Sequence, residues 1–132
     1  MSHSELPAHV NRQPLVLLVE GHALLREALE HILRGQLGLE RFAYAENGDA
    51  AIRGAAELEP WLVLIDFSLP DMNGLEAARR ILECAPATHI VLLIEPPEEA
   101  YRAAAEASGV TACIAKTALW DELPVVVSKL LE

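Results

Sequence analysis

Short apolar runs alternate with segments of helical period along most of the chain. Most of the runs are apolar at every position, which is typical of central strands in a parallel sheet that helices cover on both faces. The run at 41–45 alternates only weakly and predicts a short, less buried strand. Strands are predicted at 15–19, 41–45, 61–65, 89–94 and 110–115, with helices at 22–35, 49–59, 73–82 and 96–109 and a last helix toward Leu131.

Glycine and proline mark the expected ends of the helices. Gly35 and Gly38 are stop signals for the first helix. Pro96 and Pro97, followed by two glutamates, predict the start of the fourth helix, because helix starts favour proline and acidic residues. Pro124 is expected near the first turn of the last helix, where a missing N–H costs least.

Strand–helix pairs in succession predict an α/β sandwich with a parallel sheet in a single domain. In such sheets the functional crevice lies beyond the carboxyl ends of the strands. The sequence therefore predicts a site at that edge of the sheet. The residues at these strand ends are Glu20, Gly21, Asp66, Ile94, Glu95 and Lys116.

Composition narrows the classes of partner. Of the 132 residues, 52% are hydrophobic and 23% are charged, and this hydrophobic fraction is enough for one buried core. A chain of this length is too short for two domains. A formal net charge of −10 argues against direct nucleic-acid binding and against an anionic membrane surface. No apolar run reaches the roughly 18 residues of a membrane span. Residues 1–13 lack a signal-peptide pattern and are expected to be a flexible tail before a domain at 14–132.

The two cysteines, Cys84 and Cys113, lie in apolar surroundings. Neither belongs to a C-x-x-C motif or has a histidine at metal-ligand spacing. We therefore expect both to be buried, reduced thiols of a cytoplasmic protein.

Three ionisable residues, Glu20, Asp66 and Lys116, each end an otherwise apolar strand. Their common position predicts a carboxylate beside an ammonium group above the sheet. Such a pair serves as a nucleophile, a cation site or a structural ion pair, and the residues alone leave these three open.

Three segments carry a family resemblance. Residues 19–29 (VEGHALLREAL), 64–74 (LIDFSLPDMNG) and 114–116 (IAK) resemble the receiver domain of two-component response regulators, in particular the LuxR/NarL-type subfamily. The resemblance implies a flavodoxin-like (βα)5 three-layer sandwich with a five-stranded parallel sheet of order 2-1-3-4-5. Members of the subfamily usually carry a C-terminal DNA-binding domain, which this sequence does not contain, so we expect a stand-alone receiver or a piece of a longer protein.

The resemblance also implies roles for the residues at the strand ends. Asp66 matches the phosphoacceptor, which takes a phosphoryl group from a sensor histidine kinase with Mg²⁺ present, and Lys116 matches the lysine that pairs with it. Phe67 lies at a phosphoryl-binding position, and the backbone carbonyl of Ser68 matches a metal ligand. Glu20, Asp66 and Ser68 would then be the metal ligands.

This sequence departs from the family pattern at three places. Gly21 replaces the second of two adjacent acids, and Glu20 is one methylene longer than the usual aspartate. Ile94 stands where the family has a threonine or serine that binds the phosphoryl group, so a hydrogen bond worth roughly 1.5 to 3 kcal/mol is expected to be lost. Cys113 replaces an aromatic residue of the fifth strand. Because Mg²⁺ demands near-octahedral oxygen ligands, we expect its binding to be weak or absent.

The sequence therefore favours an atypical receiver with impaired Mg²⁺-dependent phosphorylation, a regulatory and protein-interaction module rather than an enzyme. Its expected partners are an output domain or another protein, a second copy of the chain, or a histidine kinase. We do not expect this segment itself to bind nucleic acid or a membrane. The alternative is a conventional receiver, phosphorylated on Asp66 and controlling transcription through a DNA-binding output domain. A hydrolase of the haloacid dehalogenase type is a weaker hypothesis, because Ser68 stands where that class of enzyme needs a second aspartate. A flavodoxin-like ligand-binding module also stays open, because Gly21 and Ile94 would leave a roomier apolar crevice.

Overall fold

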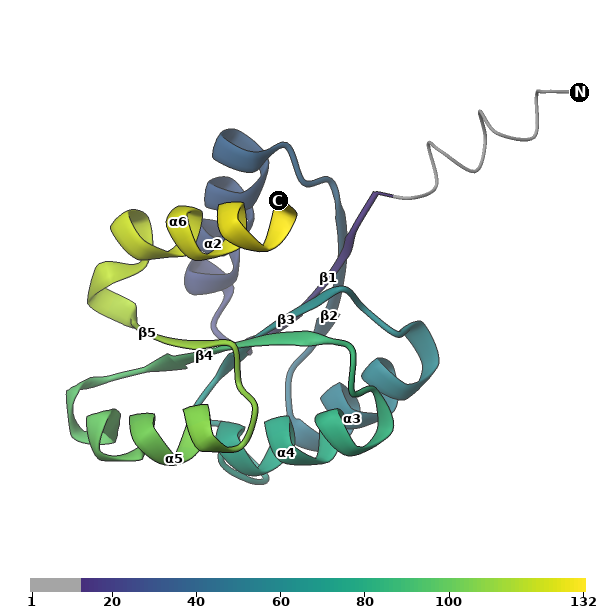
Figure 1. The fold of residues 1–132 in the computed structure, drawn as a ribbon, viewed down its shortest axis with the longest axis vertical. Helices are drawn as coiled ribbons and strands as arrows, with labels where there is room; N and C mark the ends of the chain where they lie inside the picture. Colours follow the sequence, from purple (N-terminus) through teal and green to yellow (C-terminus); the bar gives the residue numbers. More distant parts are fainter. Residues whose placement is uncertain (1–12) are drawn as a thin grey trace, which may run out of the picture.

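The computed structural model describes residues 13–132, and strands and helices alternate along them as the pattern predicted (Figure 1). Each apolar run becomes a strand, and each amphipathic segment becomes a helix. The elements are β1 (Leu15–Val19), α2 (Ala23–Leu37), β2 (Arg41–Ala45), α3 (Gly48–Leu58), β3 (Leu62–Asp66), α4 (Gly74–Cys84), β4 (His89–Ile94), the 3₁₀ helix η2 (Pro96–Tyr101), α5 (Arg102–Ala107), β5 (Ala112–Ala115), the 3₁₀ helix η3 (Lys116–Ala118) and α6 (Leu119–Leu131).

The strands form one five-stranded sheet in the order β2-β1-β3-β4-β5, and every pair of neighbours is parallel. Helices α2 and α6 cover one face of the sheet, and α3, α4 and α5 cover the other (Figure 1). This confirms the predicted flavodoxin-like three-layer sandwich and its strand order. The carboxyl ends of β1, β3 and β5 consequently lie at the same edge of the sheet.

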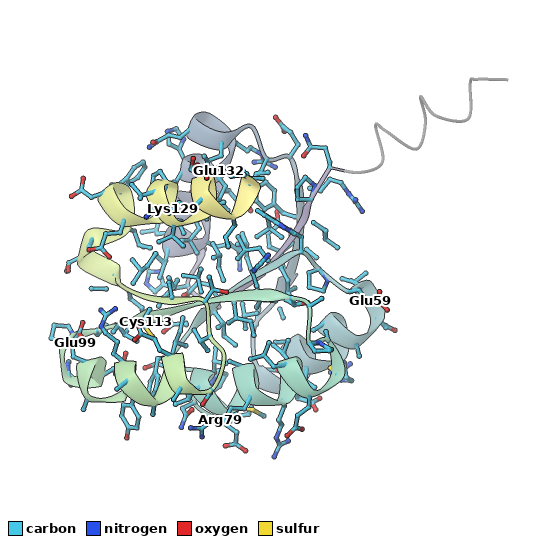
Figure 2. All side chains as sticks on the ribbon, in the orientation of Figure 1. Glu59, Arg79, Glu99, Cys113, Lys129 and Glu132 are labelled. Atoms are coloured by element: carbon cyan, nitrogen blue, oxygen red, sulfur yellow. The ribbon has the colours of Figure 1, made fainter. Side chains whose placement is uncertain are left out.

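The core is divided by the sheet into two apolar layers, which Figure 2 shows filled by side chains. Successive residues of a strand point to opposite faces. In β1, for example, Val16 and Leu18 pack toward α2 and α6, whereas Leu17 and Val19 pack toward α3 and α4. The central strands are buried on both sides, which explains why their sequences are apolar at every position.

Several helix boundaries differ from the prediction. The first helix continues through Gly35 and ends at Gly38, whose φ of 70° is left-handed and suits glycine. The segment after β4 begins as the 3₁₀ helix η2, and only six residues, Arg102–Ala107, are α-helical. Pro124 is the sixth residue of α6, in the second turn rather than the first.

The two cysteines differ in environment. Cys113 is buried between the sheet and the α3–α5 layer (Figure 2), as predicted. The prediction for Cys84 was wrong, because this residue ends α4 and is exposed. Neither cysteine forms a disulfide.

The tail expected over residues 1–13 lies, apart from Gln13, outside the described residues. Gln13 itself is fixed at the amino edge of the sheet, because its backbone carbonyl accepts a hydrogen bond from Arg41. In the described part of the chain, no helix is both long and apolar enough to cross a membrane.

Candidate functional site

A cavity of about 630 Å³ opens at the carboxyl edge of the sheet. Its walls come from the residues that follow β1, β2, β3, β4 and β5, so chain segments far apart in sequence meet there. The lining residues are Glu20, Gly21, His22, Leu25, Glu46, Asp66, Ser68, Leu69, Pro70, Glu95 and Lys116. The three ionisable residues that the sequence placed at strand ends therefore line one cavity.

Asp66 and Lys116 form a direct ion pair in this cavity. The Nζ atom of Lys116 donates to Oδ2 of Asp66 at 2.8 Å, and their side chains are 19% and 6% exposed, respectively. The other carboxylate oxygen of Asp66 accepts a hydrogen bond from the backbone N–H of Ser68 at 2.9 Å. Burial by itself lowers the pKa of Lys116, but its hydrogen bonds to Asp66 and Glu95 outweigh burial and leave the pKa raised. Lys116 is therefore a firmly charged ammonium group.

The loop after β3 holds Asp66 in place through the start of α4. The side chain of Asn73 caps this helix by accepting a hydrogen bond from the backbone N–H of Glu76 at 2.8 Å. The backbone N–H of Gly74 donates to the carbonyl of Phe67 at 2.6 Å. A side chain at position 74 would collide with the backbone carbonyl of Asp66. Glycine is needed there because the helix start lies directly against the end of β3.

Glu20 is the third charged residue at this edge, and it is only 4% exposed. Its Oε2 atom accepts a hydrogen bond from the backbone N–H of His22 at 3.0 Å, whereas its Oε1 atom is buried without a partner among the described residues. Burial, followed by the closeness and negative charge of the Asp66 carboxylate, raises the pKa of Glu20 from 4.5 to about 7, despite opposing effects of His22 and Lys116. Glu20 therefore holds a proton next to Asp66 up to near-neutral pH.

A second acid reaches Lys116 from the end of β4. Oε2 of Glu95 lies 3.0 Å from Nζ of Lys116. The backbone N–H of Glu95 donates to Oε1 of Glu98 at 2.8 Å, and the hydroxyl of Ser68 donates to Oε2 of Glu98 at 3.0 Å. Because Ser68 also donates to Asp66, these contacts close a ring of five residues: Asp66, Lys116, Glu95, Glu98 and Ser68. We call this set the acidic ring.

The structure assigns Ile94 a different place from the one expected. Its side chain is fully buried in the apolar layer facing α3, α4 and α5, and it does not line the cavity. The next residue, Glu95, points into the site. Ile94 therefore does not line the cavity as expected, because neighbouring residues of a strand face opposite sides, and its correspondence to the phosphoryl-binding residue of the family stays a prediction.

Phe67 lies beside the site without facing into it. Its backbone N–H donates to the carbonyl of Leu93 at 2.9 Å, so this group is occupied within the sheet. Its ring packs against Tyr101 of η2, with ring centroids 4.8 Å apart. Phe67 thus links the residue after Asp66 to the segment that follows β4, and its expected phosphoryl-binding role stays a prediction.

Sequence reasoning missed the pairing of Glu95 and Glu98 with the site. Glu95 was recognised as a residue at the sheet edge, and Glu98 only as part of a helix start. An acid directly after a buried strand was the available signal, the same one that identified Glu20 and Asp66. Nothing in the sequence indicates that Glu98 reaches Ser68, 30 positions earlier in the chain.

Several of the groups expected to bind Mg²⁺ already have hydrogen-bond partners within the protein. Gly21 supplies no side-chain ligand, and both carboxylate oxygens of Asp66 already accept hydrogen bonds, from Ser68 and Lys116. The pKa of Glu20 is raised to about 7 beside Asp66, so its carboxyl group is partly protonated near neutral pH. Over residues 13–132, no group of three or more His, Cys, Asp or Glu side chains is placed to hold a metal ion.

Comparisons with known sequences agree with the motifs. A sequence model of the family described as the response regulator receiver domain matches residues 16–128. The chain is 31% identical over 108 residues to "Response regulator GacA" of Pseudomonas protegens, covering 82% of this chain and 51% of that protein. It is 41% identical over 68 residues to "Transcriptional regulatory protein YdfI" of Bacillus subtilis, covering 52% and 32%, respectively. The chain thus spans about half the length, or less, of these curated relatives.

Solved structures give the same result for the fold. A two-component response regulator of the LuxR family from Aurantimonas superposes with a TM-score of 0.81 at 25% identity, covering 90% of this chain and 85% of that one. The response regulator domain of CheB from Thermotoga maritima superposes with a TM-score of 0.76 at 25% identity, covering 91% and 94%.

Proposed function

Since the chain belongs to the response regulator receiver domain family, we propose that it is an atypical receiver, a regulatory and protein-interaction module that signals without Mg²⁺-dependent phosphorylation of Asp66. The observation that carries this proposal is the state of the two remaining acids. The pKa of Glu20 is raised to about 7 next to Asp66, and each carboxylate oxygen of Asp66 accepts a hydrogen bond, one from Lys116 and one from Ser68.

Phosphoryl transfer on this fold depends mainly on positioning and on neutralisation of charge by a cation. With Gly21 in place of an acid, the cavity offers too few oxygen ligands for tight Mg²⁺ binding. The buried Asp66–Lys116 pair then acts as a structural ion pair that fixes the ends of β3 and β5. We infer that Mg²⁺ binding is weak or absent.

The partners of such a module are other proteins. We propose that it works with an output domain or a separate protein, in part because the matches cover only 51% and 32% of the two curated relatives. The transcriptional role named for the Bacillus relative suggests a DNA-binding output domain. With a net charge of −10, this segment itself is a poor ligand for nucleic acid. We assign no enzymatic activity to it, and homodimer formation and a cytoplasmic location stay predictions.

Intact-protein mass spectrometry after incubation with Mg²⁺ and acetyl phosphate tests this proposal. The wild type and the control Asp66→Ala are both expected to remain unmodified. A matched variant, Gly21→Asp, restores the second acid, and a Cβ at this position would meet only the carbonyl of Glu46 at 3.8 Å, an ordinary contact. One phosphoryl group on the folded wild type, absent from Asp66→Ala, would overturn the proposal.

A conventional receiver is the second candidate, and the intact Asp66–Lys116 pair at 2.8 Å favours it. In that case a sensor histidine kinase donates the phosphoryl group to Asp66, and Glu20 loses its proton to take part in metal binding. The same experiment separates the two candidates, because a conventional receiver gains the phosphoryl group without any substitution.

A further inference from the structure

The acidic ring joins the ends of three neighbouring strands through side chains. Glu95 follows β4 directly, Lys116 follows β5 and Asp66 ends β3. Because Ile94 points into the apolar layer, the alternation of the strand directs Glu95 toward the cavity. Its carboxylate lies 3.0 Å from Lys116, close to the 2.8 Å of the Asp66 pair. Lys116 therefore has two carboxylate partners and donates to both.

The backbone around Glu95 is held in place. Pro96 and Pro97 follow it and restrict the backbone torsions at the start of η2. Glu98, one turn further, accepts hydrogen bonds from the backbone N–H of Glu95 and from the hydroxyl of Ser68. The backbone from which the Glu95 side chain reaches Lys116 is thus held in place, although the side chain itself is 54% exposed.

We propose that Glu95 is an internal occupant of the anion-binding position at Lys116, so that it competes with any phosphate group that approaches this lysine. An external anion must displace the Glu95 carboxylate to reach Nζ of Lys116, and it meets the negative charges of Glu95 and Glu98 on the way. This inference deepens the proposed function and rests on it, since it names the group that occupies the site in place of a phosphoryl group.

The competition is moderate in size, because an ion pair with one exposed partner is screened by solvent. Removing the charge of Glu95 is therefore expected to strengthen phosphate binding at Lys116 by roughly threefold to tenfold. Asp66 repels a free phosphate by itself, so the effect is measured with Asp66→Asn as the starting variant. Asparagine keeps the shape of the side chain and an oxygen acceptor for Ser68.

The chain contains only two lysines, Lys116 and Lys129, so ¹³C-labelled lysine gives two side-chain NMR signals. The signal of Lys116 is followed while inorganic phosphate is added at constant ionic strength, which removes differences in screening. The variants compared are Asp66→Asn, Asp66→Asn with Glu95→Gln, and Asp66→Asn with Glu46→Gln. Glu46 lines the same cavity but is not an ion-pair partner of Lys116 in the described structure, so its replacement is a control for net charge.

A saturable shift of Lys116, tighter by the stated factor with Glu95→Gln than with Glu46→Gln and absent at Lys129, is the expected result. Equal affinities of these two variants would overturn the proposal, because net charge alone would then explain the change. The absence of phosphate binding in both would also overturn it, because Lys116 would not be an anion site. No metal or phosphodonor is present, and every variant carries Asp66→Asn, which removes the phosphoacceptor carboxylate. The outcome is therefore independent of whether Asp66 of the wild type is phosphorylated.

Discussion

Replacing Glu20 with glutamine is expected to stabilise the protein above neutral pH and to have little effect near pH 5. Glu20 is 4% exposed and lies against Asp66, and its pKa is raised from 4.5 to about 7. Glutamine has almost the same shape, is neutral at every pH and keeps a donor for the neighbouring carboxylate. The substitution therefore isolates the cost of the negative charge of Glu20.

The sign follows from proton binding in the two states. Between pH 4.5 and about 7 the folded protein holds a proton on Glu20 that the unfolded chain has released. The free energy of unfolding of the wild type therefore falls as the pH rises through this range. Each pH unit contributes at most about 1.4 kcal/mol, so the loss from Glu20 reaches roughly 3 kcal/mol by pH 8. Glu20→Gln removes this loss.

Urea unfolding of the wild type and Glu20→Gln, monitored by circular dichroism between pH 5 and 8, measures this difference directly. Taking the difference cancels groups that titrate identically in both proteins. Glu46→Gln is the matched control: it removes the same charge from an exposed position on the same cavity and is expected to give a difference that does not vary with pH. A Glu20→Gln difference that stays constant within about 0.5 kcal/mol across this range would show that Glu20 is already ionised at pH 5 and would refute the reasoning.

Three further substitutions test individual contacts, two of them at the site and one, at Thr88, at the opposite, amino edge of the sheet. Lys116→Met leaves the buried carboxylate of Asp66 without its cation, so a loss of about 2 to 3 kcal/mol in the free energy of unfolding is expected in urea. Adding Asp66→Asn to this variant should recover much of the loss. Equal stabilities of the single variant Lys116→Met and the double variant would contradict this prediction. Gly74→Ala introduces a methyl group against the backbone carbonyl of Asp66, so a loss of about 1 to 3 kcal/mol is expected in the same assay, and an unchanged midpoint would count against the close approach. Thr88→Val removes the hydroxyl that donates to the carbonyl of Pro60 at 2.8 Å, and a thermal melt should show a loss of about 1 to 3 kcal/mol, because that buried acceptor loses its partner.

Much of the fold was determined by the sequence itself. The apolar runs identify the strands because residues of a central parallel strand are buried on both faces, a local property of composition. The acids and the lysine that end these runs identify one edge of the sheet, because parallel strands end on the same side. Glu20, Asp66 and Lys116 were therefore predictable as neighbours from residues 19–20, 64–66 and 114–116 alone.

The tertiary structure decided which atoms meet at that edge. Whether Ile94 or Glu95 faces the cavity depends on the register of β4, because a shift of one residue reverses the direction of every side chain in a strand. The pairing of Glu95 with Lys116 and of Glu98 with Ser68 joins residues 21 and 30 positions apart, which no local pattern encodes. The proton on Glu20 likewise arises from burial beside Asp66, since the same glutamate in an unfolded chain is ionised at neutral pH. The sequence by itself determined the sheet and the residues of its functional edge, and only the packed chain decided their charges and their partners.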